Sequence, residues 1–358
     1  MTSQRLAVVG ASGVVGRALI ERATTSGIDV TGFSRRAPDL PNCRHVRLDL
    51  TDRDACARAA STELKQVTHL VYAALYEKPG LIAGWRERDQ MQTNLSMLEN
   101  LIEPLLAANP GLRGITLLQG TKAYGAHIKP MRIPGKEREP RVAHENFYWL
   151  QEDYLKAKQR EADFSLILWR PQIIFGHALA APMNLLAAIG VYAAFCKSRG
   201  EPLGWPGGTS GIQEAIDAEL LADAILFSLD NDAFANETFN ITNGDVFRWE
   251  NIWPTIAEAF DMEAGSPTPR SLATFCADEA AWQSIVSASG LRPHTLAALV
   301  GDSFFYADAL FNTGRDRPPP PAIVSTVKLR HAGFGACMDT EDMFAKWFSR
   351  LRQMKLFP

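Results

Sequence analysis

At 358 residues, with 46% hydrophobic residues, the chain is long enough for one large domain or about two smaller ones. A formal net charge of -3 excludes a broad basic field, so neither nucleic acid nor a membrane surface is an expected partner. Five cysteines, scattered and without C-x-x-C spacing, disfavour a disulfide framework or a metal site. The first predicted strand begins close to Met1 and the longest apolar run, 185–196, is too short to span a bilayer, so we expect a cytoplasmic protein.

The first motif is the glycine-rich stretch 10–16, Gly-Ala-Ser-Gly-Val-Val-Gly, between a predicted buried strand, 6–9, and a helical pattern, 14–26. Gly10 permits a tight turn, Gly13 lets the backbone approach a pyrophosphate, and Gly16 lets the helix pack closely on the strand. The alternative is a surface turn with coincidental glycines, which the flanking strand and helix disfavour. The stretch therefore predicts a dinucleotide-binding turn.

Strand-like runs alternate with helical patterns along the first half of the chain. The predicted strands are 6–9, 30–33, 46–48, 69–73, 114–118 and 165–169, and the predicted helices are 14–26, 52–64, 86–107 and 146–161. This alternation predicts an α/β fold, a Rossmann-type doubly wound parallel sheet that binds its ligand beyond the carboxyl ends of the strands. We assign 1–178 and 213–245 to this NADP-binding domain. The remaining residues, 179–212 and 246–358, form a smaller, mainly helical C-terminal substrate domain, in which 185–196 is a buried helix or a pocket wall.

Ser34-Arg35-Arg36 closes the second predicted strand, where an NAD-specific protein usually places an acidic residue against the ribose 2′-hydroxyl. A carboxylate would repel a 2′-phosphate, whereas a guanidinium can bind one bidentately. We therefore predict NADP(H) as the cofactor; the alternative is that Arg35 and Arg36 are ordinary surface cations. Asp49 closes the third strand, where it either accepts a hydrogen bond from the adenine amino group or caps the next helix.

Two candidate catalytic residues come later in the chain, and both are expected at the carboxyl edge of the sheet. Lys122 comes just after the strand 114–118 and points at the nicotinamide end, unless it is a solvated loop charge. Tyr148 lies in the first turn of the helix 146–161, behind the predicted N-cap Asn146, where a general acid is needed; the alternative is a core aromatic. The residues between them, 126–145, mix proline, glycine and charge, and are predicted to form a long loop acting as a lid or rim.

Tyr154 and Lys158 spell the Y-x-x-x-K pair of the short-chain dehydrogenases. The pair begins well inside an exposed, charged helix, more than a turn beyond the expected active position. Tyr148 is therefore preferred, and Tyr154 with Lys158 is the working pair under the alternative that the protein is an ordinary member of that class.

These stretches together resemble an extended short-chain dehydrogenase/reductase and, more narrowly, the progesterone 5β-reductase and iridoid synthase family. The matching stretches are GASGVVG (10–16), SRR (34–36), GTKAYG (120–125), NFYWLQED (146–153), WRPQIIFG (169–176), PMNLLAAIGVYAAFCKSRGEPLGWPG (182–207), FNITNGDVFRWENIWPTIAEAF (239–260) and KLRHAGF (328–334). An ordinary nucleotide-sugar epimerase has Y-x-x-x-K where this chain has Tyr148 and Glu152. The usual catalytic serine is absent too, with Gly120 near its place.

The resemblance implies NADPH-dependent 1,4-reduction of a C=C bond conjugated to a carbonyl. Tyr148 matches the family's catalytic tyrosine and Lys122 its catalytic lysine. The hydroxyl of Tyr148 would hydrogen-bond the enolate oxygen that forms when hydride reaches the β-carbon, and Lys122 would bind the nicotinamide ribose. Matching cofactor contacts are Ser12, Gly13, Val14, Arg35, Arg36, Asp49 and Leu50. We also expect cofactor contacts from Gly10, Val15, Gly16, Ser34, Ala73, Ala74, Lys122, Tyr148 and Ile174.

The chain departs from the family where a substrate would bind. The family commonly has a second tyrosine at the position of Trp149, and a threonine or tryptophan near Ala74 and Leu75. The loop 126–145 is also shorter than in the plant enzymes. Steroid or iridoid-precursor specificity therefore does not transfer to this chain.

The predicted pocket suits a small or medium apolar enone. Its expected lining is Tyr76, Trp85, Phe175, Met183, Tyr192, Trp205 and residues near 304–311, each with core packing as the alternative role. Two other functions stay open: a ketone reductase or a sugar epimerase or dehydratase of the extended class, and a non-catalytic NADP-sensing regulator. A homodimer and a monomer are both compatible with the sequence.

Overall fold

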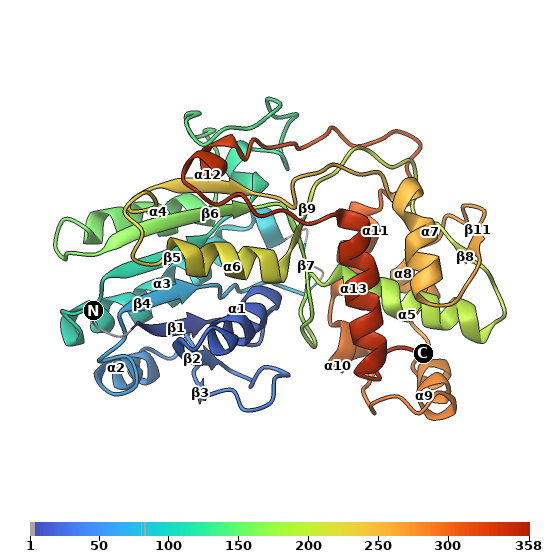
Figure 1. Ribbon diagram of the computed structural model, residues 1–358, viewed down its shortest axis with the longest axis horizontal. Coiled ribbons are helices and arrows are strands. Elements are labelled where there is room, and N and C mark those ends of the chain that lie inside the picture. Colours follow the sequence, from blue (N-terminus) through green and yellow to red (C-terminus); the bar gives the residue numbers. More distant parts are fainter. Residues whose placement is uncertain (1–3, 80, 82–83) are drawn as a thin grey trace.

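The computed structural model describes residues 4–79, 81 and 84–358, which form a sheet lobe and a helical lobe (Figure 1). The sheet lobe is built on a seven-stranded parallel sheet of order β10-β6-β5-β4-β1-β2-β3. The strands are β1 (Arg5–Val9), β2 (Asp29–Ser34), β3 (His45–Arg47), β4 (His69–Tyr72), β5 (Gly114–Leu118), β6 (Ser165–Pro171) and β10 (Thr238–Ile241). The order reverses between β1 and β4, which is where a doubly wound sheet binds its ligand.

Helices cover both faces of this sheet. On one face lie α1 (Val14–Thr25) and α6 (Ala218–Ser228), and on the other lie α2 (Arg53–Ser61), α3 (Arg88–Ala108) and α4 (Phe147–Lys158). Because successive side chains of a strand point to opposite faces, Leu6 and Val8 pack into the first of these cores, while Ala7 and Val9 pack into the second. The sheet is therefore buried on both sides, as its apolar strands predict.

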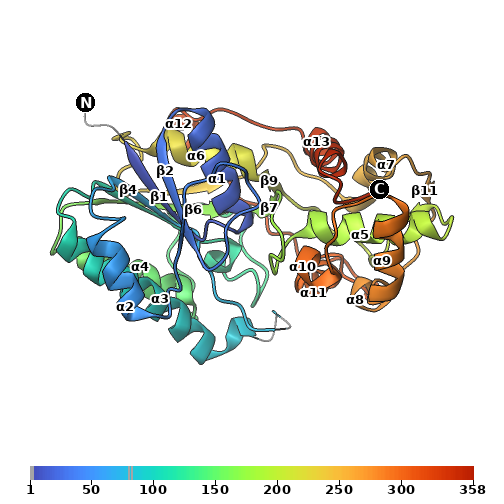
Figure 2. The same cartoon turned by 90° about the horizontal axis from the view of Figure 1, so that it is seen from below.

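The helical lobe is organised around α5 (Leu185–Ser198), whose residues 185–196 are all buried (Figure 2). The helices α7 (Trp249–Ala259), α8 (Leu272–Phe275), α9 (Glu279–Ala288), α10 (Leu296–Val300), α11 (Ser303–Leu310) and α13 (Thr340–Gln353) build this lobe around it. Two strand pairs complete the fold: β8 (Leu203–Gly204) with β11 (Ala264–Gly265), and β7 (Ile173–Phe175) with β9 (Ala215–Asp217). Short 3₁₀ helices are η1 (Gly84–Arg86) and η2 (Thr121–Tyr124).

The predicted fold class is confirmed, and most element boundaries agree to within a few residues. Among the strands of the main sheet, β10 is absent from the predicted strands, because Thr238-Phe-Asn-Ile241 alternates polar and apolar residues and gives no apolar run. The strands of the two small pairs, β7, β8, β9 and β11, have two or three residues each and are absent from the prediction too. The short helix α12 (Val327–His331) lies inside the range assigned to the substrate domain, yet it packs on β10, with Leu329 in the core of the sheet lobe. The segment around α12 therefore returns to the sheet.

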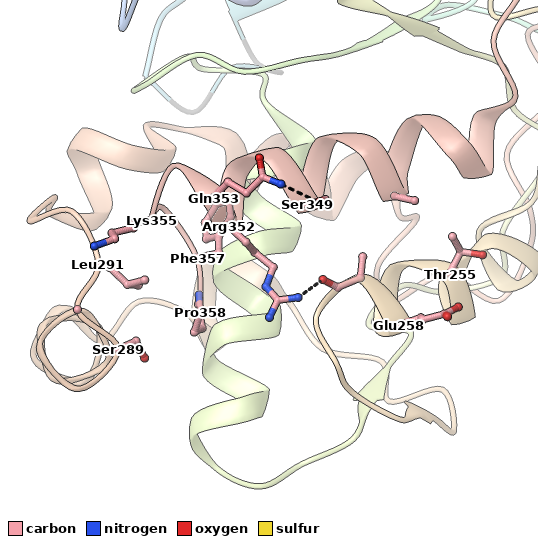
Figure 3. A pocket seen from close by; sticks show the side chains of 13 residues that line it. Thr255, Glu258, Ser289, Leu291, Ser349, Arg352, Gln353, Lys355, Phe357 and Pro358 are labelled. Carbon is pink, nitrogen blue, oxygen red and sulfur yellow. Dashed lines mark hydrogen bonds between the residues drawn. The ribbon is translucent and has the colours of Figure 1, made fainter.

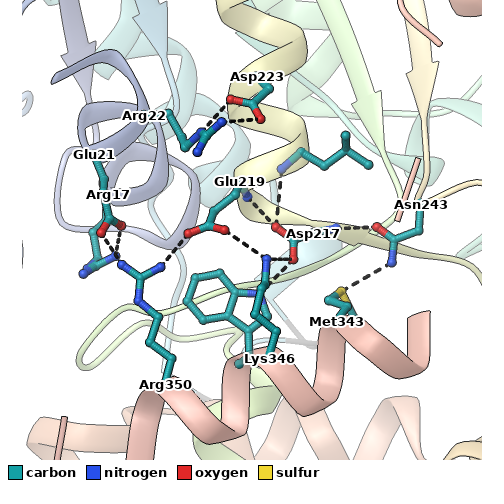
Figure 4. A network of polar contacts seen from close by, with 12 residues as sticks. Arg17, Glu21, Arg22, Asp217, Glu219, Asp223, Asn243, Met343, Lys346 and Arg350 are labelled. Atoms are coloured by element: carbon teal, nitrogen blue, oxygen red, sulfur yellow. Dashed lines mark hydrogen bonds and ion pairs between the residues drawn. The ribbon is translucent and has the colours of Figure 1, made fainter. Parts of the chain in front are cut away.

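A network of charged side chains fastens α13 to the sheet lobe (Figure 4). Asp217, fully buried at the N-cap of α6, accepts hydrogen bonds from Lys346 Nζ at 2.6 Å and from Trp347 Nε1 at 3.0 Å. Arg350 of α13 bridges Glu219 of α6 and Glu21 of α1. The last helix is thus held to both helices that cover this face of the sheet. In the part of the chain that the structure describes, no helix is both long and apolar enough to cross a membrane.

Candidate cofactor and active site

The glycine-rich turn joins β1 to α1 at the carboxyl edge of the sheet. Gly10 has a φ of +92°, and a Cβ atom there would lie 2.7 Å from the backbone of Ala73 and Ala74, which follow β4. A Cβ atom on Gly16 would collide with the carbonyl oxygen of Gly10. Both glycines are therefore required by close backbone approach.

The helix N-terminus that follows is open to a ligand. Gly13 is the N-cap of α1 and carries no side chain to cap it, so the first-turn amides are left for a ligand; they belong to Val14, Val15 and Gly16. Ser12, Gly13 and Val14 are half-buried, whereas Val15 is buried. This arrangement of glycines and amide groups fits the pyrophosphate of a dinucleotide.

The predicted adenosine end lies beyond β2 and β3. Arg35 and Arg36 are exposed, and the Ser34 hydroxyl donates a 2.5 Å hydrogen bond to the carbonyl of Arg36, which fixes the turn that presents them. Asp49 is exposed and accepts hydrogen bonds from the amide and hydroxyl of Thr51, and these lower the pKa of its carboxyl.

The cap of α2 is Asp52, not Asp49, since its side chain accepts from the amide of Ala55. Leu50 is buried, and its carbonyl accepts from Asn100. Ile174, in β7, is half-buried and packs against the core that also holds α1.

Lys122 is positioned by η2 and lies over an aromatic ring. Its Nζ is 3.6 Å from the centre of the Trp85 ring, and Trp85 Nε1 donates to Glu77 Oε2 at 3.1 Å. The same carboxylate oxygen accepts from Gln90 Nε2 at 2.7 Å. The other oxygen, Glu77 Oε1, is buried and has no hydrogen-bond partner among the described residues. One carboxylate oxygen of Glu77 is therefore unpaired among the described residues and available to a ligand beside Lys122.

Tyr148 reaches the same edge from the first turn of α4. The side chain of Asn146 accepts from the amide of Tyr148 at 3.1 Å, which confirms Asn146 as the N-cap. A Cβ atom on Gly120 would lie 3.3 Å from the Tyr148 hydroxyl oxygen. The hydroxyl therefore stands directly beside Gly120, the residue before η2 and two positions from Lys122.

The electrostatics couple these side chains. Burial lowers the pKa of Lys122 to about 8, against the opposing effect of Glu77. Burial also raises the pKa of Glu77. Burial, together with the charge of Glu77 and the neighbouring Tyr306, raises the pKa of Tyr148 well above its ordinary value. Tyr148 is therefore a neutral phenol at physiological pH, able to donate a hydrogen bond.

The position four residues after Tyr148 has a structural role. Glu152 is buried, accepts hydrogen bonds from Gln119 Nε2 at 2.7 Å and Lys156 Nζ at 2.6 Å, and forms an ion pair with Arg141 Nη2 at 2.8 Å. A paired carboxylate thus occupies the place of the lysine in the Y-x-x-x-K pattern, and Lys122 enters from a different element.

Tyr154 and Lys158 lie elsewhere. The Tyr154 hydroxyl donates to Glu103 Oε1 at 2.9 Å, and Lys158 Nζ lies 3.0 Å from the same oxygen. Glu103 belongs to α3, so the pair bridges α4 to α3 rather than facing the glycine-rich turn. Both residues are engaged in helix packing.

The predicted substrate residues divide into two groups. Tyr76, Trp85 and Met183 are half-buried. Phe175, Tyr192 and Trp205 are buried in the core of the helical lobe, where the Tyr192 hydroxyl donates to the Gly204 carbonyl at 2.9 Å and Trp205 stacks on Trp249. The core-packing alternative accounts for these three.

The structure adds Glu77 to this site and narrows the predicted range 304–311 to Tyr306. Tyr306, from α11, is half-buried, and its pKa is raised by burial and by Glu77. Tyr306 lies in the range 304–311 expected near the pocket, whereas nothing in the sequence pattern singled out Glu77. The sequence feature that could have indicated Glu77 is its position five residues after the buried strand β4.

The loop 126–145 has neither helix nor strand, as predicted, but it is fastened at its centre. Gly135 exchanges backbone hydrogen bonds with Ile323 and Ser325, and its carbonyl also accepts from Asn240 of β10. Trp149, at the family's second-tyrosine position, is buried beneath this loop, with the Arg141 guanidinium 4.6 Å from its ring centre.

A groove of about 890 Å³ lies away from this edge, between α7, α9 and α13 (Figure 3). Thr255, Glu258, Arg352 and Lys355 contribute to its polar wall. The Arg352 guanidinium is already bound to the Ala259 carbonyl and to Asp261. None of the predicted site residues lines this groove.

Comparison with known proteins places the chain among nicotinamide-dependent enzymes. Residues 6–242 match the NAD dependent epimerase/dehydratase family. The chain is 30% identical to an (S)-8-oxocitronellyl enol synthase of Camptotheca acuminata, over 85% of this chain and 82% of that one. It is 28% identical to the 3-oxo-Δ4,5-steroid 5β-reductase of Arabidopsis thaliana, over 98% and 92%.

Among solved structures, the UDP-glucose 4-epimerase of Thermus thermophilus, determined in complex with NAD, superposes with a TM-score of 0.66. It covers 98% of this chain and 99% of its own, at 15% identity, and so supports the fold.

Proposed function

This chain belongs to the NAD dependent epimerase/dehydratase family, in the branch of extended short-chain dehydrogenases/reductases that holds the steroid 5β-reductases and iridoid synthases, and we propose that it is an NADPH-dependent enone reductase. The observation that carries the proposal is the placement of the Tyr148 hydroxyl beside Gly120, two residues before Lys122, while Tyr154 and Lys158 are engaged by Glu103.

The cofactor preference rests on the end of β2. Arg35 and Arg36 are exposed there, and no carboxylate occupies Ser34-Arg35-Arg36, the place where an acidic residue would oppose a 2′-phosphate. When bound, NADPH supplies the hydride that the β-carbon of an α,β-unsaturated carbonyl compound accepts. Glycines 10, 13 and 16 and the first-turn amides of α1 hold the pyrophosphate.

Side chains of the protein stabilise the negative charge that develops on the substrate's carbonyl oxygen. Addition of hydride to the β-carbon moves an electron pair onto the carbonyl oxygen and forms an enolate. The neutral phenol of Tyr148 donates a hydrogen bond to that oxygen, and the Lys122 ammonium supports it electrostatically. The enolate then takes a proton from solvent water at the α-carbon, which completes the saturated ketone and leaves NADP⁺.

The substrate is a small or medium apolar enone. Tyr76, Trp85 and Met183 from the predicted lining, with Tyr306 from α11, supply aromatic and thioether surface around the site, while Phe175, Tyr192 and Trp205 are left to the core. The relatives' named substrates are not transferred, because Ala74, Leu75 and Trp149 depart from the family pattern.

The test is to mix purified protein with NADPH and 2-cyclohexen-1-one, follow NADPH absorbance, and identify the product by mass and NMR. Saturated ketone formed with NADPH would establish 1,4-reduction. Allylic alcohol would instead identify a carbonyl reductase. NADPH binding without oxidation across a panel of cyclic and linear enones would favour the non-catalytic NADP-sensing regulator.

A further inference from the structure

The ammonium group of Lys122 lacks the partners that a desolvated cation usually has. Lys122 is half-buried, and no hydrogen bond or ion pair engages its Nζ within the described part of the chain. The Nζ atom instead lies 3.6 Å from the centre of the Trp85 ring, well inside the range of a cation–π contact. Desolvation disfavours the charged form of an amine, and the negative face of an indole opposes that effect. The ring of Trp85 is therefore a direct stabilising contact of this ammonium.

The Trp85 ring is itself held in place by side chains. Its Nε1 donates to Glu77 Oε2 at 3.1 Å, and the same oxygen accepts from Nε2 of the buried Gln90 at 2.7 Å. A Cβ atom on Gly84 would collide with the side-chain oxygen of Gln90, which also accepts from the amide of Lys78 at 3.1 Å. Gln90 thus anchors Glu77 and the backbone before Trp85 to α3, so that the indole is held in one orientation.

The other ionisable groups near Lys122 leave its charge dependent on few contacts. Glu77 favours the ammonium, at a distance longer than that of an ion pair. His127, in the loop after η2, feels the charges of Lys122 and Arg86, but burial lowers its pKa to about 4, so it is neutral where Lys122 titrates. Tyr148 is a neutral phenol in the same range. The Glu77 carboxylate and the Trp85 ring are thus the groups that favour the proton on Lys122.

We propose that Trp85 is a positioning residue for Lys122, whose ammonium it holds in place and in its charged form by a cation–π contact with the indole face. The inference rests on the proposed function, in which Lys122 supports Tyr148. In the Y-x-x-x-K arrangement the lysine shares a helix with its tyrosine, whereas Lys122 comes from η2 and α4 carries Glu152 at that place. Another group must therefore fix the ammonium, and the ring of Trp85 is in contact with it.

The first test measures the charge of Lys122 in the full chain without cofactor or substrate. Nonsense suppression places tryptophan with one, two or three ring fluorines at position 85, because fluorine weakens the cation–π contact while the indole keeps its shape and its N–H donor. NMR follows the titration of the Lys122 ε-methylene, whose signal is identified by its loss in Lys122→Arg. We expect the midpoint, near pH 8 with the natural ring, to fall by about one pH unit in the trifluorinated protein.

The matched control places the same fluorinated residues at Trp282, a buried tryptophan in α9 of the helical lobe whose Nε1 donates to the His294 carbonyl. These proteins should keep the wild-type titration of Lys122. A midpoint that does not move with fluorination of Trp85, or that moves equally with fluorination of Trp282, overturns the inference whatever the activity of the protein.

The second test links the contact to the proposed reaction. The alkaline decline of kcat/KM for NADPH in enone reduction should move with the Lys122 midpoint, so the trifluorinated protein should lose about fivefold at pH 8 and almost nothing at pH 6. Trp85→Phe should keep more of this activity at pH 8 than Trp85→Leu, since a benzene ring retains part of the contact. An unmoved decline, with a KM for the enone that rises equally at every pH, would make Trp85 a pocket wall only and overturns the positioning role.

The two tests separate this inference from the proposed function. If the wild-type protein reduces no enone while the Lys122 midpoint still follows fluorination of Trp85, the proposed function is overturned and the contact between Trp85 and Lys122 is supported. If enone reduction occurs while the midpoint ignores fluorination, the inference alone is overturned.

Discussion

Two clusters of buried ionisable groups in this protein differ in how far their members are paired. Between α6 and α13, Asp217 accepts four hydrogen bonds, from two backbone amides, Lys346 and Trp347. At the sheet edge, Glu77 keeps one buried oxygen without a partner among the described residues, and the Lys122 ammonium faces the ring of Trp85. In the first cluster the charged groups are hydrogen-bonded to one another. In the second cluster a carboxylate oxygen of Glu77 and the Lys122 ammonium are left available to a ligand.

The difference indicates what each cluster is for. Paired buried charges are strongly destabilising when one partner is removed, so the α6–α13 network fastens the lobes together. Unpaired ones cost stability and perturb pKa values, as Lys122 and Tyr148 show, and this is typical of a site that completes its hydrogen bonds with ligands. Variants of the two clusters should therefore fail in different assays.

The largest expected effect belongs to the paired network. Asp217→Ala removes the N-cap of α6 and leaves Lys346 and Trp347 without their acceptor, so we expect the free energy of unfolding to fall by about 3–5 kcal/mol. Urea denaturation measures the loss. Asp261→Asn, which removes the charge of the exposed pair with Arg352 and keeps a residue type that tolerates the φ of +55° there, is the control and should leave the free energy of unfolding nearly unchanged. A similar loss in both variants would contradict the assignment.

Tyr148→Phe should show the opposite signature. It removes the hydrogen bond to the enolate oxygen while keeping the ring, so kcat for enone reduction should fall about a hundredfold or more. The free energy of unfolding should change little. Tyr154→Phe is matched in chemistry and helix, and it should keep wild-type turnover because its hydroxyl binds Glu103. Unchanged turnover in Tyr148→Phe would overturn the catalytic assignment.

The sequence predicted the fold well because its signals are local. Buried strands give apolar runs, and the alternation of strands with helices dictates a parallel sheet. The exceptions include β10, where Asn240 interrupts the apolar pattern and binds Tyr124 and the loop at Gly135, and α12, whose return to the sheet depends on a contact distant in sequence.

The sequence predicted those site residues that belong to local motifs. Gly10, Lys122 and Tyr148 stand in recognisable local contexts, and the structure brings their elements to one edge, although their roles remain predictions. Phe175 has the same apolar character whether it lines a pocket or fills a core, so the pattern could not separate the two. Glu77 matters through its burial and missing partner, which no local pattern reveals.

The pH dependence of catalysis should report the protonation state of Lys122. With a pKa of about 8, Lys122 is an ammonium below that pH and a neutral amine above it. We expect kcat/KM for NADPH, which reports groups of the free enzyme, to fall about tenfold per pH unit well above pH 8. Lys122→Arg keeps its charge throughout, so its profile should lose this alkaline decline. The same decline in both proteins would assign it to another group.

The smallest expected effect tests whether the carboxylate of Glu77 keeps Lys122 protonated. Glu77→Gln preserves an acceptor for Trp85 and Gln90 but removes the negative charge that opposes deprotonation of Lys122. The alkaline decline should therefore move to lower pH, and kcat/KM just above pH 8 should fall about threefold, as expected for a partly screened charge pair.

The stability of the folded protein should rise in Glu77→Gln, although its kcat/KM falls. Burial raises the pKa of Glu77, so its ionised form destabilises the folded protein at neutral pH and this cost disappears as the pH falls through the folded pKa. Glu77→Gln removes the charge and should unfold at higher urea concentration than wild type at neutral pH. A lower midpoint with an unshifted pH profile would instead make Glu77 a structural residue, because the two clusters would then respond alike to the loss of a carboxylate.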